Sequence, residues 1–258
     1  MSRLSVSRVE EVRAAGDLPL WQHPEWLERM PWLVQGITGR GDEAEPFDLG
    51  LFGAAPVGAV VARWSRLRRA TGMRRVVHSR QVHGAELRSH GPADEPGLLI
   101  GDGHDGHLTR SPGVLLTISV ADCVPVYLVD VRIRAVALVH AGWRGIAAGV
   151  VERAIDRLRR WQGEGEPELW MHCGPSICGE CYEVGPEVHA ALVPNEPAPS
   201  RPEPIDLRAV VLERAAAAGI DVGRMSVSTH CTRCGPGAFF SHRGGSAGRQ
   251  MAVLGVRA

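Results

Sequence analysis

Three short apolar segments stand in the middle of the chain. They are VLLTISV (114–120), VPVYLVD (124–130) and RAVALVH (134–140), all rich in β-branched residues. Continuous apolar runs of this length are typical of strands buried on both faces. Four further segments are expected to be strands: 168–173, 225–229, 238–242 and 250–256.

Other segments repeat apolar positions with a helical period. Residues 57–70 set arginines opposite an apolar face, and residues 146–162 read as an amphipathic helix with arginines toward its C-terminal end. A further helix is expected to begin after Asp206 as N-cap and to stop at Gly219. The Pro-rich segment 194–204 is expected to be an exposed loop.

Strands mixed with helices predict an α/β (α+β) fold, with mixed β-sheets in a sandwich flanked by helices. The chain has 258 residues, of which 44% are hydrophobic, enough to bury one large core. No internal repeat stands out. We therefore expect a single domain.

The balance of basic and acidic residues indicates which kind of binding partner to expect. The 29 basic and 29 acidic residues cancel, and neither sign forms a long run. Nothing in this balance favours nucleic acid or a membrane, so a small ligand is expected. The sequence contains no lysine, which excludes P-loop phosphate binding and Schiff-base chemistry, while its arginines suit phosphate or carboxylate.

The N-terminal segment lacks the apolar core of a signal peptide. The most apolar stretch, residues 113–143, is interrupted by charges such as Asp122 and Asp130. The protein is therefore expected to be cytoplasmic. In that compartment its six cysteines are expected to be thiols or metal ligands rather than disulfides.

Three residues at predicted turns can form a metal site. Cys123 follows one predicted strand, His140 ends another, and His83 precedes Gly84, which indicates a turn. Two imidazoles and one thiolate leave a fourth zinc position open for water, as in catalytic zinc sites. Their spacing matches no zinc-finger pattern, so a buried cysteine and two hydrogen-bonded histidines are the alternative.

A possible anion site adjoins this group. His140 is followed by the turn 141–145 and then by a predicted helix, whose first N–H groups are free to bind an anion. Arg144 lies in that turn and can add a charge-assisted hydrogen bond to phosphate.

Successive motifs resemble one family. They are RQVHG (80–84), DG (105–106), SVADCVPVYLVD (119–130), HAGWRG (140–145), CGPSICGECYEVGPEV (173–188) and CTRCGPGAFFSHR with GRQMAVL (231–254). In this order they resemble the YfiH-type purine nucleoside phosphorylase family, also described as laccase-domain or polyphenol oxidase proteins. The resemblance runs from about Gly36 to the C-terminus. It implies an N-terminal extension over residues 1–30 and a YfiH-like (laccase-type) catalytic domain over 31–258.

The resemblance implies a zinc ion bound by His83, Cys123 and His140. It implies phosphorolysis of adenosine, inosine and methylthioadenosine to free base and ribose 1-phosphate, with adenosine deaminase activity. Purine nucleoside and phosphate are then the partners. We expect Arg40 and Arg144 to hold phosphate. Asp122 is expected to orient a ligand or act as base.

Other enzyme classes stay open. Histidine and cysteine also suit copper, so a copper-dependent polyphenol oxidase (laccase) is the second hypothesis, although its histidines are usually denser. A third is a Cys/His or zinc amidase acting on cell-wall precursors, with Cys123 as nucleophile. A non-catalytic binding protein is the last. Metal content separates zinc from copper, and alkylation separates a bound thiolate from a free one.

The remaining cysteines and histidines are expected to have structural rather than catalytic roles. Cys173, Cys178 and Cys181 form C-x4-C-x2-C, and Cys231 and Cys234 form C-x2-C, which suits a second metal or an iron–sulfur cluster. We expect structural thiols instead. The polar segment GDGHDGH (101–107) is expected to be a plain turn. The histidines before Cys173 and Cys231 are expected to be hydrogen-bonded core residues.

Overall fold

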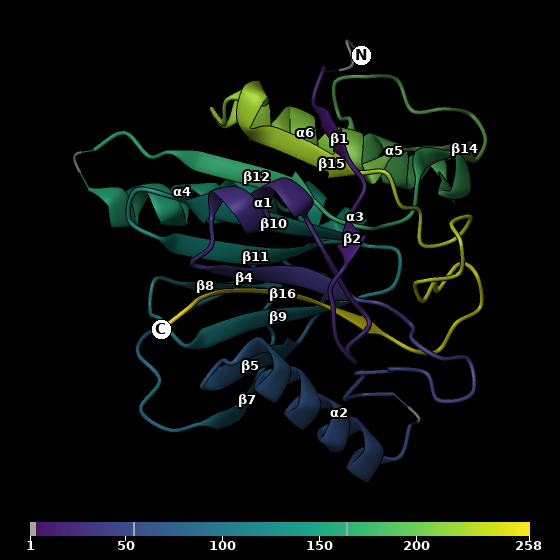
Figure 1. The fold of residues 1–258 in the computed structure, drawn as a ribbon. Coiled ribbons are helices and arrows are strands. Elements are labelled where there is room, and N and C mark those ends of the chain that lie inside the picture. Colours follow the sequence, from purple (N-terminus) through teal and green to yellow (C-terminus); the bar gives the residue numbers. More distant parts are fainter. Residues whose placement is uncertain (1–3, 54, 164) are drawn as a thin grey trace.

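The protein consists of two mixed β-sheets packed face to face, with helices on their outer faces (Figure 1). A computed structural model describes residues 4–53, 55–163 and 165–258. The predicted α/β sandwich flanked by helices is therefore confirmed. No helix in these ranges has the length and apolar character needed to cross a membrane.

The first sheet, called sheet 1 below, has the order β1-β15-β12-β10-β11-β8-β6. Its strands are β1 (Ser7–Val9), β15 (Met225–Ser228), β12 (Leu169–Cys173), β10 (Val124–Asp130), β11 (Ala135–Ala141), β8 (Gly106–Thr109) and β6 (Leu87–His90). Its centre, β12-β10-β11-β8, is antiparallel, while both edges pair in parallel.

The second sheet, sheet 2, has the order β2-β3-β4-β16-β9-β5-β7. Its strands are β2 (Val12–Arg13), β3 (Leu20–Gln22), β4 (Leu33–Thr38), β16 (Gln250–Val256), β9 (Val114–Val120), β5 (Arg75–Arg80) and β7 (Gly97–Asp102). A short ladder joins β13 (Glu183–Val184) to β14 (Glu203–Pro204).

Five of the six helices in the described ranges cover the outer faces of the sheets. The outer face of sheet 2 is covered by α2 (Val57–Thr71), and that of sheet 1 by α3 (Trp143–Ala147), α4 (Val150–Gln162), α5 (Pro186–Leu192) and α6 (Leu207–Ala217). The remaining helix, α1 (Pro24–Arg29), instead packs Trp26 into the core between the two sheets. Two 3-10 turns, Gly179–Cys181 and Val222–Arg224, complete the structure of the described ranges.

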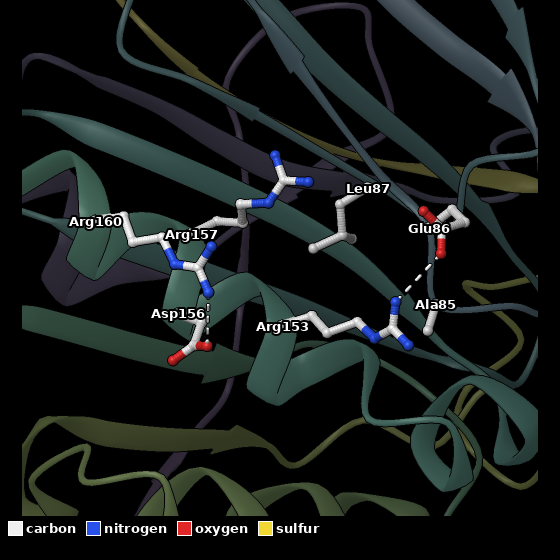
Figure 2. A pocket seen from close by; sticks show the side chains of 7 residues that line it. All are labelled: Ala85, Glu86, Leu87, Arg153, Asp156, Arg157 and Arg160. Carbon is white, nitrogen blue, oxygen red and sulfur yellow. Dashed lines mark hydrogen bonds and ion pairs between the residues drawn. The ribbon is translucent and has the colours of Figure 1, made fainter.

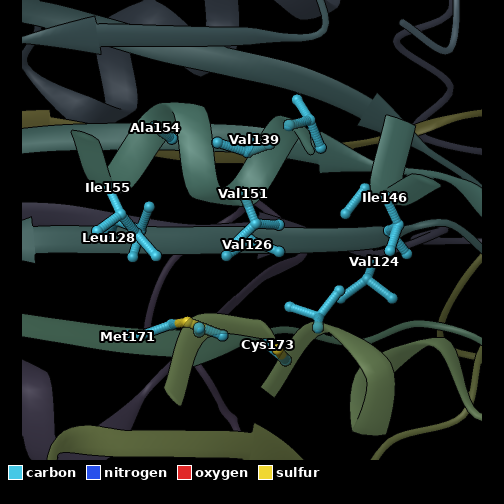
Figure 3. Close-up of a cluster of buried hydrophobic side chains, with 14 of the residues drawn as sticks. Val124, Val126, Leu128, Val139, Ile146, Val151, Ala154, Ile155, Met171 and Cys173 are labelled. Atoms are coloured by element: carbon cyan, nitrogen blue, oxygen red, sulfur yellow. The ribbon is translucent and has the colours of Figure 1, made fainter. Parts of the chain in front are cut away.

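Three apolar cores hold these layers together. One lies between sheet 1 and the helices α3 to α6, where side chains such as Leu128, Val151 and Ile155 interdigitate (Figure 3). A second lies between the two sheets and includes Leu116 and Leu138, and a third joins α2 to sheet 2. Each such side chain contributes about 1.5–3 kcal/mol by leaving water. The sheets therefore form a rigid base for the loops at their ends.

The central strands follow the hydrophobic pattern. β9 and β10 have the predicted bounds, while β11 begins one residue later than predicted because Arg134 adopts a positive φ of 49° in the preceding turn. The predictions for 168–173, 225–229 and 250–256 are confirmed to within one residue.

The predicted strand at 238–242 is wrong. The Gln250 side chain accepts a hydrogen bond from Phe240 N at 2.6 Å and donates one to Phe240 O at 3.0 Å. The Arg40 amide donates to Ala238 O. Because these partners satisfy its backbone, the segment needs no neighbouring strand.

Helix predictions are confirmed with one exception. Residues 57–70 form α2. The Asp206 side chain caps α6 by accepting from Arg208 N, and Gly219 follows its end with a φ of +87°. The single helix expected over 146–162 is divided into α3 and α4, because Gly149 takes a left-handed conformation with φ +79°.

Residues 7–22 contribute strands to both sheets. β1 pairs in parallel with β15 of sheet 1, and β3 pairs with β4 of sheet 2. The division into an extension over 1–30 and a catalytic domain over 31–258 stays a prediction. The Pro-rich loop 194–204 is mostly exposed as predicted, with only its end in β14.

Candidate metal centre and its surroundings

His83, Cys123 and His140 converge at one end of the sheets. One imidazole nitrogen of each histidine and the Cys123 Sγ all lie within 4.8 Å of one another. His140 lies near the end of β11, and Cys123 precedes β10, the strand paired with it. Because Val124 pairs with Ala141, antiparallel pairing brings Cys123 beside the end of β11. His83 comes from the β5–β6 loop.

A buried carboxylate organises two of these ligands. The Asp105 Oδ1 lies 2.9 Å from His140 Nδ1 and accepts from His83 N, also at 2.9 Å. Its Oδ2 accepts from the amides of Val82 and Gly84. Because Asp105 engages Nδ1, the Nε2 lone pair of His140 is available to a metal.

Two residues of the site have uncommon backbone conformations. His83 has a φ of 57° and Asp122 a φ of 90°. Non-glycine residues in this region cost about 1–3 kcal/mol each and persist only where their surroundings hold them. Asp105 holds the His83 turn.

Asp122 is held on three sides. Its Oδ1 accepts from Thr232 Oγ1 at 2.6 Å, and its Oδ2 accepts from Arg243 N at 2.7 Å. Its carbonyl accepts from Ile177 N. Both carboxylate oxygens are thus engaged, so Asp122 fixes the turn that presents Cys123.

Two glycines allow the loops that carry the metal ligands to lie close to one another. A Cβ at position 142 would lie 3.1 Å from His83 Cδ2 and 3.2 Å from Cys123 Sγ, and one at position 145 would lie 2.8 Å from Gly84 O. Side chains at these positions would therefore push the ligand loops apart.

The electrostatics favour a thiolate. Burial opposes ionisation of Cys123, but the charges and hydrogen bonds of His140 and His83 outweigh it and lower the thiol pKa. Burial likewise opposes the charge on His140, while Cys123 and Asp105 outweigh it and raise the imidazole pKa. Thiolate is the form that binds a metal.

The residues fit a zinc ion with an open position. The donor set is two nitrogens and one sulfur, the His140 tautomer is fixed by Asp105, and His83 is exposed. Three protein ligands with one side open to solvent are typical of catalytic zinc, whereas structural zinc is enclosed by four.

Tyr182 is influenced by the charge of Cys123 and packs against an arginine. Burial raises the pKa of Tyr182, and the charges of Cys123 and Asp122 raise it further. The guanidinium of Arg243 lies 4.8 Å from the Tyr182 ring centroid, and that of exposed Arg144 lies 4.2 Å from the Trp143 ring. Tyr182 therefore packs against Arg243 and is influenced by the charges of Cys123 and Asp122.

The predicted phosphate residues have different surroundings. The turn after His140 leads into α3, which has only five residues, so its dipole is short. Arg144 is exposed within it. The Arg40 guanidinium carbon lies 5.9 Å from the Phe240 ring centroid, and its buried Nε has no hydrogen-bond partner in the described ranges. Arg40 therefore retains a free donor.

The segment GDGHDGH does not form a single metal group. Asp102 pairs with exposed Arg80 at 2.8 Å, and His107 lies 3.0 Å from His90 across β6 and β8. Asp105 alone reaches the metal ligands. The predicted turn is confined to 103–105, because residues 101–102 end β7 and residues 106–107 begin β8, and the prediction misses the role of Asp105.

The predicted core histidines are confirmed as hydrogen-bonded. His172 is buried, with Nδ1 2.9 Å from Ser226 Oγ and Nε2 2.8 Å from Glu11 Oε1. His230 lies 3.4 Å from Glu11 O. Neither belongs to the metal group.

An open pocket lies beside α4 (Figure 2). Arg153 pairs with Glu86 at 3.2 Å, and Arg160 pairs with Asp156 at 3.5 Å. These side chains are mostly exposed, so the pairs contribute little. None of the lining residues is one of the three ligands.

The sequence does not predict the roles of four residues near the site: Asp105, Thr232, Tyr182 and Arg243. The DG and CYEVG motifs contain Asp105 and Tyr182, so the motifs mark the positions without giving their roles. Only the fold shows which atoms they contact.

The chain is similar in sequence to known proteins. The family described as "Multi-copper polyphenol oxidoreductase laccase" matches residues 43–257. Purine nucleoside phosphorylase YlmD of Geobacillus stearothermophilus is 33% identical over 250 residues, covering 87% of this chain and 90% of the relative. Adenosine deaminase RL5, from an unknown prokaryotic organism, is 37% identical over 152 residues, covering 55% of this chain and 57% of the relative.

The likeness extends to the fold. The crystal structure of YlmD from Geobacillus stearothermophilus has a TM-score of 0.84 at 27% identity, covering 96% of this chain and 100% of that chain. The crystal structure of the Bacillus licheniformis hypothetical protein YfiH has a TM-score of 0.82 at 25% identity, covering 95% and 98%.

Proposed function

The chain belongs to the multi-copper polyphenol oxidoreductase laccase family, the YfiH-type family that its motifs indicate, and from this we propose that it is a zinc-dependent purine nucleoside phosphorylase. The proposed substrates are adenosine, inosine and methylthioadenosine with phosphate. We include adenosine deamination as a second reaction of the same site. The observation that carries the proposal is the group of His83, Cys123 and His140, positioned by buried Asp105.

The three ligands give this site its proposed chemistry. His83, Cys123 and His140 would hold the zinc ion, which would supply a Lewis acid able to lower the pKa of water from 15.7 to about 7. Asp105 holds His140 in the tautomer that binds metal, and Asp122 fixes the turn of Cys123. We therefore assign Asp122 an orienting role rather than that of a base, because both of its carboxylate oxygens are occupied.

Phosphorolysis needs phosphate positioned against C1′ of the sugar. A phosphate oxygen forms the new bond to C1′, the glycosidic bond breaks, and the base departs with that electron pair and takes up a proton. Arg144 and the buried free Nε of Arg40 are the proposed phosphate donors. Tyr182 is the proposed hydroxyl donor near the reacting groups.

The test is product analysis with purified protein. Adenosine plus phosphate should give adenine and ribose 1-phosphate, and adenosine without phosphate should give inosine. His83→Ala should lose the zinc ion of this site and both products, while His189→Ala, on the surface of α5, should retain them. Zinc-loaded protein that releases neither adenine nor inosine would contradict the proposal.

Copper-dependent polyphenol oxidation is the second candidate, favoured by the description of the matched family. The described ranges contain two groups of three or more metal-binding side chains, and only one of them includes histidine. Blue-copper and multicopper sites are richer in histidine. Stoichiometric copper with a visible absorption band and phenol oxidation would favour this candidate over the phosphorylase.

A further inference from the structure

Four cysteines outside the candidate metal centre converge near the surface. Cys178 and Cys181 come from the loop between β12 and β13, and Cys231 and Cys234 follow β15, so each loop supplies one C-x2-C pair. All four Sγ atoms lie within 4.8 Å of one another. The sequence pattern favours structural thiols here, but the four sulfurs lie closer together than separate core thiols require.

The sulfur spacing matches that of ligands around one ion. A tetrahedral zinc with Zn–S bonds of about 2.3 Å places its sulfurs about 3.8 Å apart. Cys178 Sγ lies 3.8 Å from Cys234 Sγ. Bonded disulfide sulfurs lie about 2.05 Å apart, so the spacing is that of separate thiolates facing a common centre.

The backbone around the cysteines is shaped toward the sulfurs. The amides of Cys178 and Cys234 both donate to Cys231 Sγ, at 3.3 and 3.5 Å. These hydrogen bonds stabilise negative charge on the sulfur. The turn closes with Gly235 N donating to Cys231 O at 3.0 Å, and a Cβ at position 235 would collide with that oxygen. The second C-x2-C pair is thus held in a tight turn.

The two loops also contact each other next to the cysteines. Ser176 and Cys231 form a parallel bridge, and Thr232 N donates to Ser176 O at 3.1 Å. The guanidinium of Arg233 donates to Cys181 O at 3.0 Å. Backbone and arginine contacts between the loops therefore hold the two C-x2-C pairs in place without help from the sulfur atoms. A preformed metal site requires this.

We propose that Cys178, Cys181, Cys231 and Cys234 bind a structural zinc ion as four thiolates. The site is separate from the group of His83, Cys123 and His140. The neutral thiols give up four protons to solvent as the ion binds, with no change of oxidation state. Four protein ligands leave no position for substrate, so the role is structural.

This zinc would fasten loops that support the candidate metal centre. Thr232 directly follows Cys231 and binds Asp122, and Ile177 directly precedes Cys178 and donates to the Asp122 carbonyl. Tyr182 follows Cys181. The long connection between β15 and β16 otherwise lies outside the two sheets (Figure 1). The four thiolates would therefore hold both loops against the turn of Cys123.

Metal analysis of the full-length protein tests the proposal. Wild-type protein purified with zinc should contain about two ions per chain. The double variant Cys178→Ser/Cys234→Ser should retain about one, and His83→Ala should also retain about one. Combining the three substitutions should leave none. Cys173→Ala is the matched control, because the Cys173 thiol lies buried in the core. This variant should still bind two ions.

Cobalt substitution supplies a spectroscopic readout in which all four cysteines are retained. Wild-type protein loaded with Co²⁺ should show the intense sulfur-to-metal bands and visible spectrum of tetrahedral tetrathiolate cobalt, retained in His83→Ala. Loss of these bands in His83→Ala would overturn the proposal. So would unchanged zinc in Cys178→Ser/Cys234→Ser, bound iron in place of zinc, or a disulfide between these cysteines in freshly purified protein.

This outcome is distinguishable from the proposed catalytic function. A protein with a tetrathiolate zinc but no phosphorolysis would retain this site and refute only the phosphorylase. A phosphorylase with one zinc that is lost in His83→Ala would refute only the structural site.

Discussion

At the residue scale, Asp105 is the side chain on which the ligand geometry depends. It is fully buried and engages His140 Nδ1 together with three backbone amides. Asp105→Asn keeps the shape but loses one acceptor and the charge. We expect zinc affinity to fall about 10- to 100-fold, since loss of a group that orients a metal-binding histidine has an effect of this size.

Competition with a chelator measures that affinity. Asp102→Asn is the matched control, because Asp102 lies in the same segment but pairs with Arg80 on the surface. Its zinc affinity should equal that of the wild type. Equal affinities in Asp105→Asn and wild type would show that the carboxylate does not orient the ligand.

His78 gives a prediction for pH dependence. Burial lowers its pKa from 6.5 to about 4, against the effect of its hydrogen bond with Thr117. Below pH 6.5 the unfolded chain takes up a proton that the folded protein refuses. The free energy of unfolding should therefore fall by about 3 kcal/mol from this group as the pH drops from 6.5 toward 4.

Denaturant unfolding at several pH values checks this sign. His78→Asn, whose amide can donate to Thr117 as Nδ1 does, should flatten the decline below pH 6.5 even if the variant is less stable. His242→Asn, at an exposed position, should retain the wild-type slope. A steeper or unchanged slope in His78→Asn would contradict the assignment.

The residues of the site differ in how far the sequence predicts them. His83, Cys123 and His140 are predicted because motifs carry them, and the structure brings them together. The role of Asp105 depends on a tertiary approach, since the residue lies 22 positions from His83 in sequence and binds its amide. The role of Thr232 likewise depends on a contact that spans 110 positions. No local pattern encodes such distances.

At the element scale, the start of α3 has to pass close to the ligands. A Cβ on Gly142 would lie within 3.2 Å of both Cys123 Sγ and His83 Cδ2. Gly142→Ala should therefore displace one ligand and reduce phosphorolysis and the zinc affinity of the His83, Cys123 and His140 site at least 10-fold, because misplacement of about 1 Å has large effects on catalysis.

Gly58→Ala is the control for that substitution. Gly58 lies in α2, and a Cβ there meets no atom within 4 Å. This variant should retain zinc and activity and gain about 0.5–1 kcal/mol in stability, since alanine favours helix over glycine. Full zinc occupancy in Gly142→Ala would show that the loops carrying His83 and Cys123 can move to accommodate the added methyl group.

Elements are predictable where local pattern and burial agree. β9 and β10 are apolar, β-branched and buried on both faces, so the pattern gives their bounds. The error at 238–242 arises because a side chain, Gln250, satisfies the backbone there. The break at Gly149 arises from a left-handed residue that helical periodicity does not register.

At the scale of the whole molecule, the N-terminal strands connect the two sheets through a buried polar network. Glu11 Oε1 lies 2.8 Å from His172 Nε2, and its Oε2 accepts from Ser228 Oγ at 2.7 Å. Ser226 Oγ lies between His172 and His23, which precedes α1. A network of this kind ties residues before position 30 to sheet 1.

Glu11→Ala tests whether the first residues are part of the fold. The substitution leaves His172 and Ser228 buried without their acceptor, so the free energy of unfolding should fall by about 2–3 kcal/mol. Glu10→Ala removes an equal charge from the adjacent exposed position and should change it by less than about 0.5 kcal/mol. Urea unfolding of both variants at pH 7 gives the comparison. Equal stabilities would mean that the Glu11 network does not stabilise the fold, whereas the expected difference would make the segment that carries Glu11 a structural part of the same domain.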